Sequence, residues 1–154
     1  MLDGAGLRFR AACGRSGLSA CKEEGDGATP LGLLKLVRVL YRADRTRKPD
    51  CAVPVEPIAP DDGWCDDPAD PAYNRHIRIP YAARHEILWR EDGLYDVVGV
   101  LGWNFGPVTP GRGSAIFLHV ATRDYAPTAG CIALNLPELH RVLAAGLTAI
   151  RVVA

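Results

Sequence analysis

A cysteine and a histidine in the C-terminal part of the chain have the residue types and spacing of a nucleophile and its base. Cys131 lies in TAGCIAL (residues 128–134) and His119 in IFLHV (residues 116–120). A thiol attacks a carbonyl carbon as the thiolate, so it needs a base or a positive neighbour that lowers its pKa from about 8.5, and imidazole supplies either. Gly130 permits a sharp turn that leaves the amides of Gly130 and Cys131 free to face an oxyanion. The pattern predicts cysteine acyl transfer.

The same residues have a second interpretation. A cysteine beside isoleucine and leucine is, on local sequence alone, more typical of a small core residue than of a nucleophile. Thiol reactivity separates the two cases. A catalytic Cys131 with a lowered pKa is expected to react with iodoacetamide well below pH 8, whereas a structural thiol in a folded protein is inert.

The elements that flank the pair must bring it together. SAIFLHVA (residues 114–121) is a short apolar run typical of a buried strand, with His119 near its end. Cys131 begins the next predicted strand, and Pro127 and Gly130 permit the connection to fold back. A hairpin of this length would place both side chains at one sheet edge.

One helix is predicted directly after the cysteine. Asn135 is the expected N-cap, Glu138 completes a capping box, and Pro137 occupies the tolerated first turn. An apolar stripe follows and ends at Gly146. The stripe consists of Leu136, Leu139, Val142 and Leu143.

The rest of the chain favours strands joined by turns, because short apolar runs recur between 16 glycines and 12 prolines. The predicted fold is a mainly β single domain spanning residues 1–154, with two packed sheets. Residues 23–32 are expected to form a turn, and the proline- and aspartate-rich stretch 44–76 a functional or disordered loop. The remaining strands are predicted at 6–14, 33–41, 85–90, 94–103 and 147–154.

Composition excludes several functions. Eighteen basic residues balance eighteen acidic ones, so no net field attracts nucleic acid or an anionic membrane surface. No stretch approaches the roughly 20 apolar residues of a membrane span, and no signal-peptide core follows the N-terminus. The five cysteines are too scattered for paired zinc ligands and too few for a disulfide scaffold. We expect a monomer.

The aspartates of the 44–76 stretch raise the question of a calcium loop. Their spacing lacks the central glycine and terminal glutamate of an EF-hand, which favours a solvated acidic loop or a lid over the cleft. His76, His85 and His140 lack the spacing of a zinc helix and are interpreted as surface or capping residues. The aspartates are Asp61, Asp62, Asp66, Asp67 and Asp70.

Several segments together resemble a known family. FLHVATRDYAPTAGCIAL (residues 117–134) is similar to the active-site segment of the L,D-transpeptidase (YkuD-like) family, in which a histidine precedes a Ser/Thr-x-Gly-Cys motif. KEEGDGATPLG (residues 22–32) resembles that family's early Thr-Pro-x-Gly turn. Residues 63–80 and 102–119 resemble a small single-domain branch. The resemblance covers about residues 22–154 and is specific in the order of its segments.

The resemblance implies a role for each matching residue. Cys131 becomes the nucleophile, His119 its base, Gly130 the glycine at the oxyanion site and Thr128 the Ser/Thr position. The Val120 carbonyl or a nearby group is expected to orient the imidazole. The implied fold is a β-sandwich of two mixed sheets with one short helix after the cysteine.

Two positions depart from the family pattern. Ala129 stands where many members have histidine, and Ala133 where many have arginine, so neither side chain can bind a peptide carboxylate. Arg112 and Arg123 are therefore candidates for that role. Trp103, Asn104 and Tyr125 lie near the proposed cleft in sequence, where substrate contact and aromatic packing are both open.

The implied chemistry is that of the cell wall. Cys131 would attack a peptidoglycan tetrapeptide stem after the L-centre of diaminopimelate, release D-alanine and hold a thioester. An amine acceptor then gives a cross-link, and water gives an L,D-carboxypeptidase or related hydrolase. No metal or organic cofactor is required, carbapenems are expected inactivators, and the periplasm or cell envelope is the expected location. The short N-terminal edge predicts that a leader or first strand precedes this chain.

Two further functions compete with this one. A sortase also pairs histidine with a later cysteine and adds an arginine, for which Arg141 is the candidate, but TAG before Cys131 differs from the sortase motif. A non-catalytic wall-binding module is suggested by Ala129 and Ala133. Retention of both His119 and Cys131 speaks against it.

Overall fold

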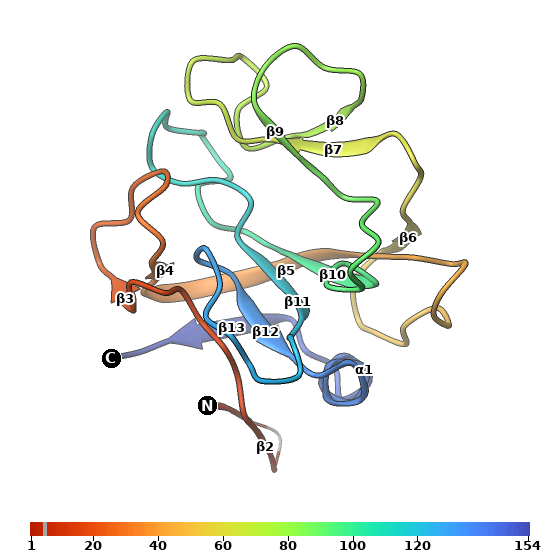
Figure 1. Ribbon diagram of the computed structural model, residues 1–154. Coiled ribbons are helices and arrows are strands. Elements are labelled where there is room, and N and C mark those ends of the chain that lie inside the picture. Colours follow the sequence, from red (N-terminus) through yellow and green to blue (C-terminus); the bar gives the residue numbers. More distant parts are fainter. Residues whose placement is uncertain (5) are drawn as a thin grey trace.

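A computed structural model describes residues 1–4 and 6–154. The chain forms one central mixed sheet with a smaller sheet on one face and a helix on the other (Figure 1). In chain order the elements are β1 (Leu2–Gly4), β2 (Leu7–Phe9), β3 (Leu18–Ser19), β4 (Thr29–Pro30), β5 (Gly32–Tyr41), β6 (Val55–Pro57), β7 (Asp62–Cys65), β8 (His76–Arg78), β9 (His85–Ile87), β10 (Val97–Leu101), β11 (Phe117–Val120), β12 (Ile132–Leu134), α1 (Leu136–Ala144) and β13 (Ala149–Val152).

The central sheet has the order β12-β11-β10-β5-β13, and β6 also pairs with β5. β5 is its longest strand and pairs antiparallel with β10 and with β13. β11 continues the sheet antiparallel to β10, and β12 pairs with β11 in parallel. The small sheet is antiparallel, with the order β8-β7-β9, and two-stranded sheets form from β1 with β2 and from β3 with β4.

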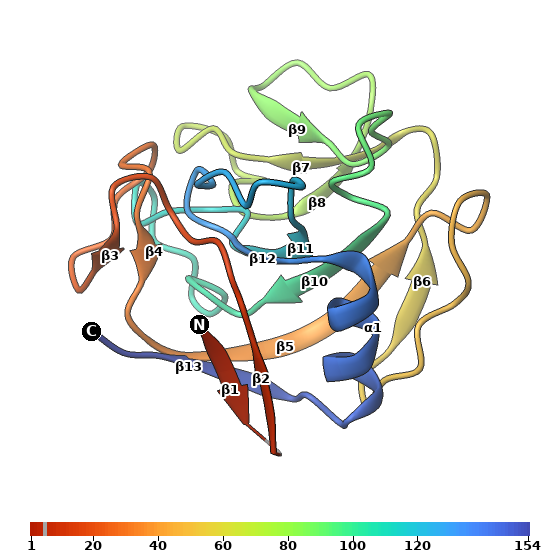
Figure 2. The same cartoon turned by 60° about the horizontal axis from the view of Figure 1, so that its bottom comes forward.

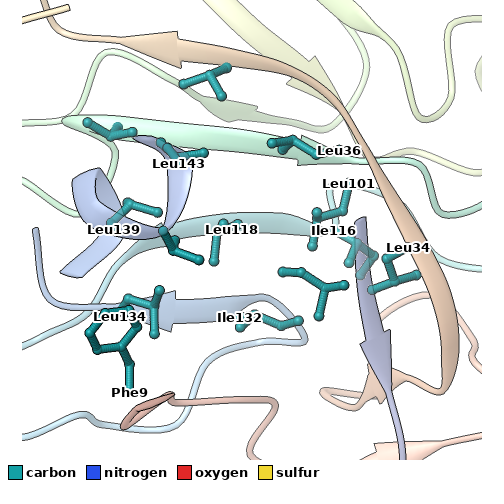
Figure 3. Close-up of a cluster of buried hydrophobic side chains, with 14 residues drawn as sticks. Phe9, Leu34, Leu36, Leu101, Ile116, Leu118, Ile132, Leu134, Leu139 and Leu143 are labelled. Atoms are coloured by element: carbon teal, nitrogen blue, oxygen red, sulfur yellow. The ribbon is translucent and has the colours of Figure 1, made fainter. Parts of the chain in front are cut away.

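Each face of the central sheet has its own apolar cluster. Side chains of successive residues in a strand point to opposite faces, so Leu118 and Ile132 pack toward α1, whereas Phe117 and Cys131 pack toward the small sheet. Figure 3 shows the helix-side cluster, in which Leu139 and Leu143 of α1 lie against the sheet. The turned view shows the same layers, with β7, β8 and β9 above the central sheet and α1 beside it (Figure 2).

α1 confirms the helix prediction. The side chain of Asn135 accepts a hydrogen bond from the Glu138 amide, at 2.9 Å. Leu139, Val142 and Leu143 are the buried residues of its apolar stripe. The cap fixes where the helix begins, only a few residues after Cys131.

Two predictions about local structure are wrong. The stretch 44–76 is not without regular structure, because β6 and β7 lie inside it. The strands that flank residues 121–131 do not form a hairpin, because β11 and β12 run parallel. A parallel neighbour requires the chain to return to the start of the strand it left, and residues 121–131 make that return.

The predicted mainly β fold is confirmed, with a single helix in the part of the chain that the structure describes. The strands at 33–41, 94–103 and 147–154 correspond to β5, β10 and β13 with shorter or shifted ends. The predicted strand at 85–90 is regular only over β9, and the one at 6–14 only over β2.

Candidate active site

The parallel pairing of β11 with β12 places the thiol and the imidazole on one face of the sheet. Leu118 is the Cα partner of Ile132, and His119 is the partner of Ala133. Cys131 comes directly before Ile132 and therefore lies diagonal to His119 across the two strands, on the face opposite to Leu118 and Ile132.

A cavity of about 290 Å³ lies at this position, between the edge of the central sheet and β9. Both Cys131 and His119, the predicted nucleophile and its predicted base, line it. Glu86 and Tyr95 line the side toward the small sheet. Residues 126–129 of the β11–β12 connection form another wall.

His119 is held in the form that a general base needs. Its Nδ1 donates a hydrogen bond to the Val120 carbonyl oxygen at 2.9 Å, so Val120 is the orienting group that the sequence predicts. With the proton on Nδ1, the lone pair belongs to Nε2. Burial lowers the pKa of His119, which favours the neutral ring. The Tyr95 ring meets the imidazole edge-on, with 5.5 Å between centroids.

Cys131 rests as a thiol. Its Sγ donates to the Ala115 carbonyl oxygen at 3.3 Å and accepts from the Phe117 amide at 3.4 Å. Burial, together with the negative charge of Glu86, raises the pKa of Cys131 to about 12. This differs from the lowered pKa that a nucleophile was expected to have. Among the described residues, no hydrogen bond joins Sγ to His119, so the sulfur must rotate away from Ala115 before the imidazole can take its proton.

The turn before Cys131 is built by Thr128. Its Oγ1 donates to the Cys131 carbonyl oxygen at 2.7 Å and accepts from the Gly130 amide at 3.1 Å. The Gly130 amide is therefore engaged and does not stand free for an oxyanion, which differs from the prediction. The Cys131 amide has no acceptor among the hydrogen bonds recorded for the described residues, and it is the remaining candidate donor.

Gly130 is required for two independent reasons. Its φ is +138°, a conformation that L side chains rarely adopt. A Cβ atom at this position would lie 2.9 Å from the Ala28 carbonyl oxygen. The turn can therefore approach the chain near Ala28 only with glycine directly before Cys131.

The N-terminal segment clamps the same turn. Ala12 and Ala133 exchange backbone hydrogen bonds of 2.9 and 3.0 Å. Cys13 accepts from the Thr128 amide at 2.9 Å, and Arg15 donates to the Thr128 carbonyl oxygen at 2.8 Å. Residues ahead of position 22, where the family resemblance was taken to begin, thus contribute directly to the position of Cys131.

The cavity is also lined by three residues that were not predicted from the sequence: Glu86, Arg90 and Tyr95. Glu86 is a charged residue within the predicted strand HEILWR, and this charge was the sequence signal that could have marked it as a site residue. The Tyr95 hydroxyl donates to Glu86 Oε2 at 2.6 Å. Arg90 lies over the Tyr95 ring at 4.9 Å from the centroid, and its Nε bonds both carboxylate oxygens of Asp92, at 3.0 and 3.1 Å.

Three predicted substrate-binding residues have internal partners. The Tyr125 hydroxyl donates to Glu138 and accepts from the side-chain amide of Asn135, so Tyr125 packs at the start of α1. Trp103 Nε1 donates to the Arg112 carbonyl oxygen at 2.7 Å. The side-chain amide of Asn104 donates to two carbonyls of the 105–113 loop and its oxygen accepts an amide there.

None of these three residues lines the cavity, and neither do the two candidate arginines. Arg112 and Arg123 are both exposed. Ala129 and Ala133 do line it, so their missing charge is a property of the cavity wall itself. Arg141 of α1 lies over the ring of Phe9, 5.2 Å from its centroid, and this contact removes Arg141 from a sortase-like role.

The titratable side chains outside this cavity add no candidate metal site in the described part of the chain. Within residues 1–4 and 6–154, no group of His, Cys, Asp and Glu is arranged to hold a metal ion. All five cysteines are free. In the acidic loop Asp61 pairs with Arg78, Asp66 pairs with Arg84, and buried Asp62 bonds His76. No helix of the described residues is both long and apolar enough to cross a bilayer.

Comparison with known proteins identifies the family of the chain. The sequence model of the YkuD family, described as the L,D-transpeptidase catalytic domain, matches residues 3–152. The chain therefore belongs to the family of L,D-transpeptidase catalytic domains. No curated protein and no solved structure matches it. The match includes the N-terminal segment that clamps the Thr128 turn, and members of this family are cysteine-dependent enzymes that act on peptidoglycan peptides.

Proposed function

We propose that this protein is an L,D-transpeptidase that forms a thioester between Cys131 and a peptidoglycan stem peptide. One observation carries the proposal: a thiol and a neutral imidazole lie on the same face of two adjacent strands and line one cavity. A binding module has no need of this pair. The orientation of His119 by Val120, which leaves Nε2 as the basic atom, supports the same conclusion.

The first half-reaction acylates the enzyme. Cys131 Sγ attacks the carbonyl carbon after the L-centre of diaminopimelate as its proton passes to His119 Nε2. The oxygen of the tetrahedral intermediate takes the negative charge, and the Cys131 amide is the candidate donor to it. The carbon–nitrogen bond then breaks, and His119 returns the proton to the leaving amine of D-alanine.

The second half-reaction frees the enzyme. An amine of a second stem attacks the thioester carbon and gives its proton to His119. The carbon–sulfur bond breaks, and Cys131 recovers its proton as a thiol. Water in place of the amine gives the L,D-carboxypeptidase reaction with the same residues. Because stem peptides are parts of the cell wall, we place this activity in the periplasm or cell envelope.

The first experiment is intact-protein mass spectrometry. Wild type, Cys131→Ala and, as a control for an exposed thiol, Cys21→Ala are each incubated with a carbapenem and separately with a stem tetrapeptide. We expect a one-to-one carbapenem adduct and a tripeptidyl thioester on wild type and on Cys21→Ala, with none on Cys131→Ala. Release of D-alanine, with and without an amine acceptor, then separates transfer from hydrolysis. D-alanine release that persists in Cys131→Ala would refute the proposal.

A further inference from the structure

Glu86 is placed at the active site by the small sheet. It is the Cα partner of Trp64 in the β7–β9 pair, and Trp64 belongs to the apolar cluster that also holds Phe117 and Cys131. Side chains of directly opposed residues share a face of a sheet. Glu86 therefore projects from β9 toward the central sheet, into the cavity of Cys131 and His119.

The other charges of this cavity are already matched. Arg90 is the only arginine or lysine among its lining residues, and its guanidinium forms an ion pair with Asp92 and stacks on Tyr95. His119 is neutral because burial lowers its pKa. Ala129 and Ala133 add no charge to the wall.

Glu86 is the unmatched charge. It forms no ion pair with any described residue. Its Oε2 accepts the Tyr95 hydroxyl, and Oε1 has no hydrogen-bond donor among the described residues. Burial raises the pKa of Glu86, and the Tyr95 hydroxyl and the positive charge of Arg90 oppose this shift without cancelling it. A ligand cation beside Oε1 would match this charge.

We propose that Glu86 is a specificity-determining residue that binds the free ammonium group of the donor peptide, carried on the diamino acid whose carbonyl Cys131 attacks. The inference rests on the proposed function, because it names the group that the same cavity selects. Tyr95 holds the carboxylate by its hydroxyl, and the two alanines leave the cavity without a cation for a substrate carboxylate. The site accordingly selects a donor by its positive group.

Binding at Glu86 also acts on the nucleophile. The charge of Glu86 is one cause of the raised pKa of Cys131. An ammonium group beside this carboxylate offsets that charge, so the donor peptide lowers the barrier to forming the thiolate that attacks it. The enzyme without donor keeps its thiol protonated.

The test uses two tetrapeptide donors that differ only in acetylation of the diamino-acid amine. Thioester formation on Cys131 and D-alanine release are measured for wild type, Glu86→Gln and the control Glu91→Gln. Glutamine keeps an acceptor for Tyr95 but removes the charge. Glu91 is exposed, pairs with Arg45 and does not line the cavity.

We expect wild type and Glu91→Gln to prefer the free-amine donor in kcat/KM by about 10- to 100-fold, the range for loss of a hydrogen bond to a charged group. Glu86→Gln should lose this preference because its rate on the free-amine donor falls. Its rate on the acetylated donor should not fall, because removal of the carboxylate charge also removes one cause of the raised pKa of Cys131. Glu86→Asp should restore part of the preference.

Three outcomes would overturn the inference. The first is a wild type that processes both donors equally, which needs no variant and so cannot be blamed on misfolding. The second is Glu86→Gln losing activity equally on both donors, as a purely structural residue would. The third is the absence of a Cys131 thioester with either donor, which refutes the proposed function as well. The first two leave the proposed function intact.

Discussion

Replacement of Gly130 by alanine tests whether the turn beside the nucleophile depends on glycine. A non-glycine residue in this region of φ costs about 1–3 kcal/mol. The added Cβ also meets the Ala28 carbonyl oxygen at 2.9 Å, and a backbone atom cannot move as the end of a side chain can. Forced overpacking adds roughly 1–3 kcal/mol. The free energy of unfolding should fall by about 2–6 kcal/mol in total.

Gly146 provides the matched control. Its φ of +87° is also positive, but a Cβ there would meet nothing within 4 Å. Gly146→Ala therefore tests backbone strain without a steric clash and should cost only about 1–2 kcal/mol. For a domain of this size each kcal/mol lowers Tm by about 2–4 °C.

The assay is thermal unfolding followed by circular dichroism, combined with the rate of carbapenem acylation. Gly130→Ala should lower Tm by at least twice as much as Gly146→Ala and should slow acylation, because Cys131 follows directly. Gly146→Ala should leave acylation unchanged, since it lies beyond α1. Equal Tm losses in the two variants would show that contact with Ala28 does not constrain the turn.

Three further measurements test the electrostatics and the helix. Because its pKa is raised to about 12, Cys131 of the free enzyme should react with iodoacetamide more slowly than exposed Cys21 at pH 7.5. The rate at Cys131 should rise about tenfold per pH unit up to pH 10. Peptide mapping that finds Cys131 alkylated first would contradict this. Because burial raises the pKa of Glu86 above 4.5, its charged form destabilises the fold at high pH and the penalty disappears as the pH falls toward 4.5. Glu86→Gln should therefore be more stable than wild type at pH 8 and equally stable near pH 4.5 in urea denaturation, and a constant difference would exclude the charge as the cause. Asn135→Ala removes the acceptor of the Glu138 amide and should cost about 1 kcal/mol, seen as a Tm lower by roughly 2–4 °C, whereas an unchanged Tm would mean that the cap adds no stability.

The features that the sequence predicts correctly depend on neighbouring residues. The N-cap at Asn135 and the apolar stripe of α1 involve residues a few positions apart, so local patterns suffice. His119 and Cys131 were singled out by their types and by the glycine before the cysteine, and their catalytic roles stay a prediction. Their placement on one sheet edge was predicted from a hairpin, whereas the two strands are parallel. Strand direction depends on long-range pairing, and a short connection is equally compatible with a hairpin.

The cavity walls could not be predicted in the same way. Glu86 and Tyr95 precede Cys131 by more than 30 residues. The packing of the small sheet against the central sheet brings Glu86 to the cavity, whereas Tyr95, just before β10, is placed by the pairing of β10 with β11. Conversely, Trp103 and Asn104 lie in a segment that leads to the active-site strand, yet their hydrogen bonds hold the 105–113 loop. Proximity in sequence therefore did not predict which residues line the cavity, because the cavity lies between packed sheets and its lining comes from distant segments.

The two strands of the parallel β11–β12 pair and the connection between them have different structural tasks. The relative position of His119 and Cys131 is set by the ladder of two strands, whereas residues 126–129 of the connection between them form a wall of the cavity. Residues 123, 124, 126 and 127 of this connection are exposed. The exposed positions ahead of Thr128, which itself holds the turn, can therefore change by evolution or by loop grafting while His119 and Cys131 keep their spacing. Under the proposed function, one thiol–imidazole pair then serves different donors on the same scaffold.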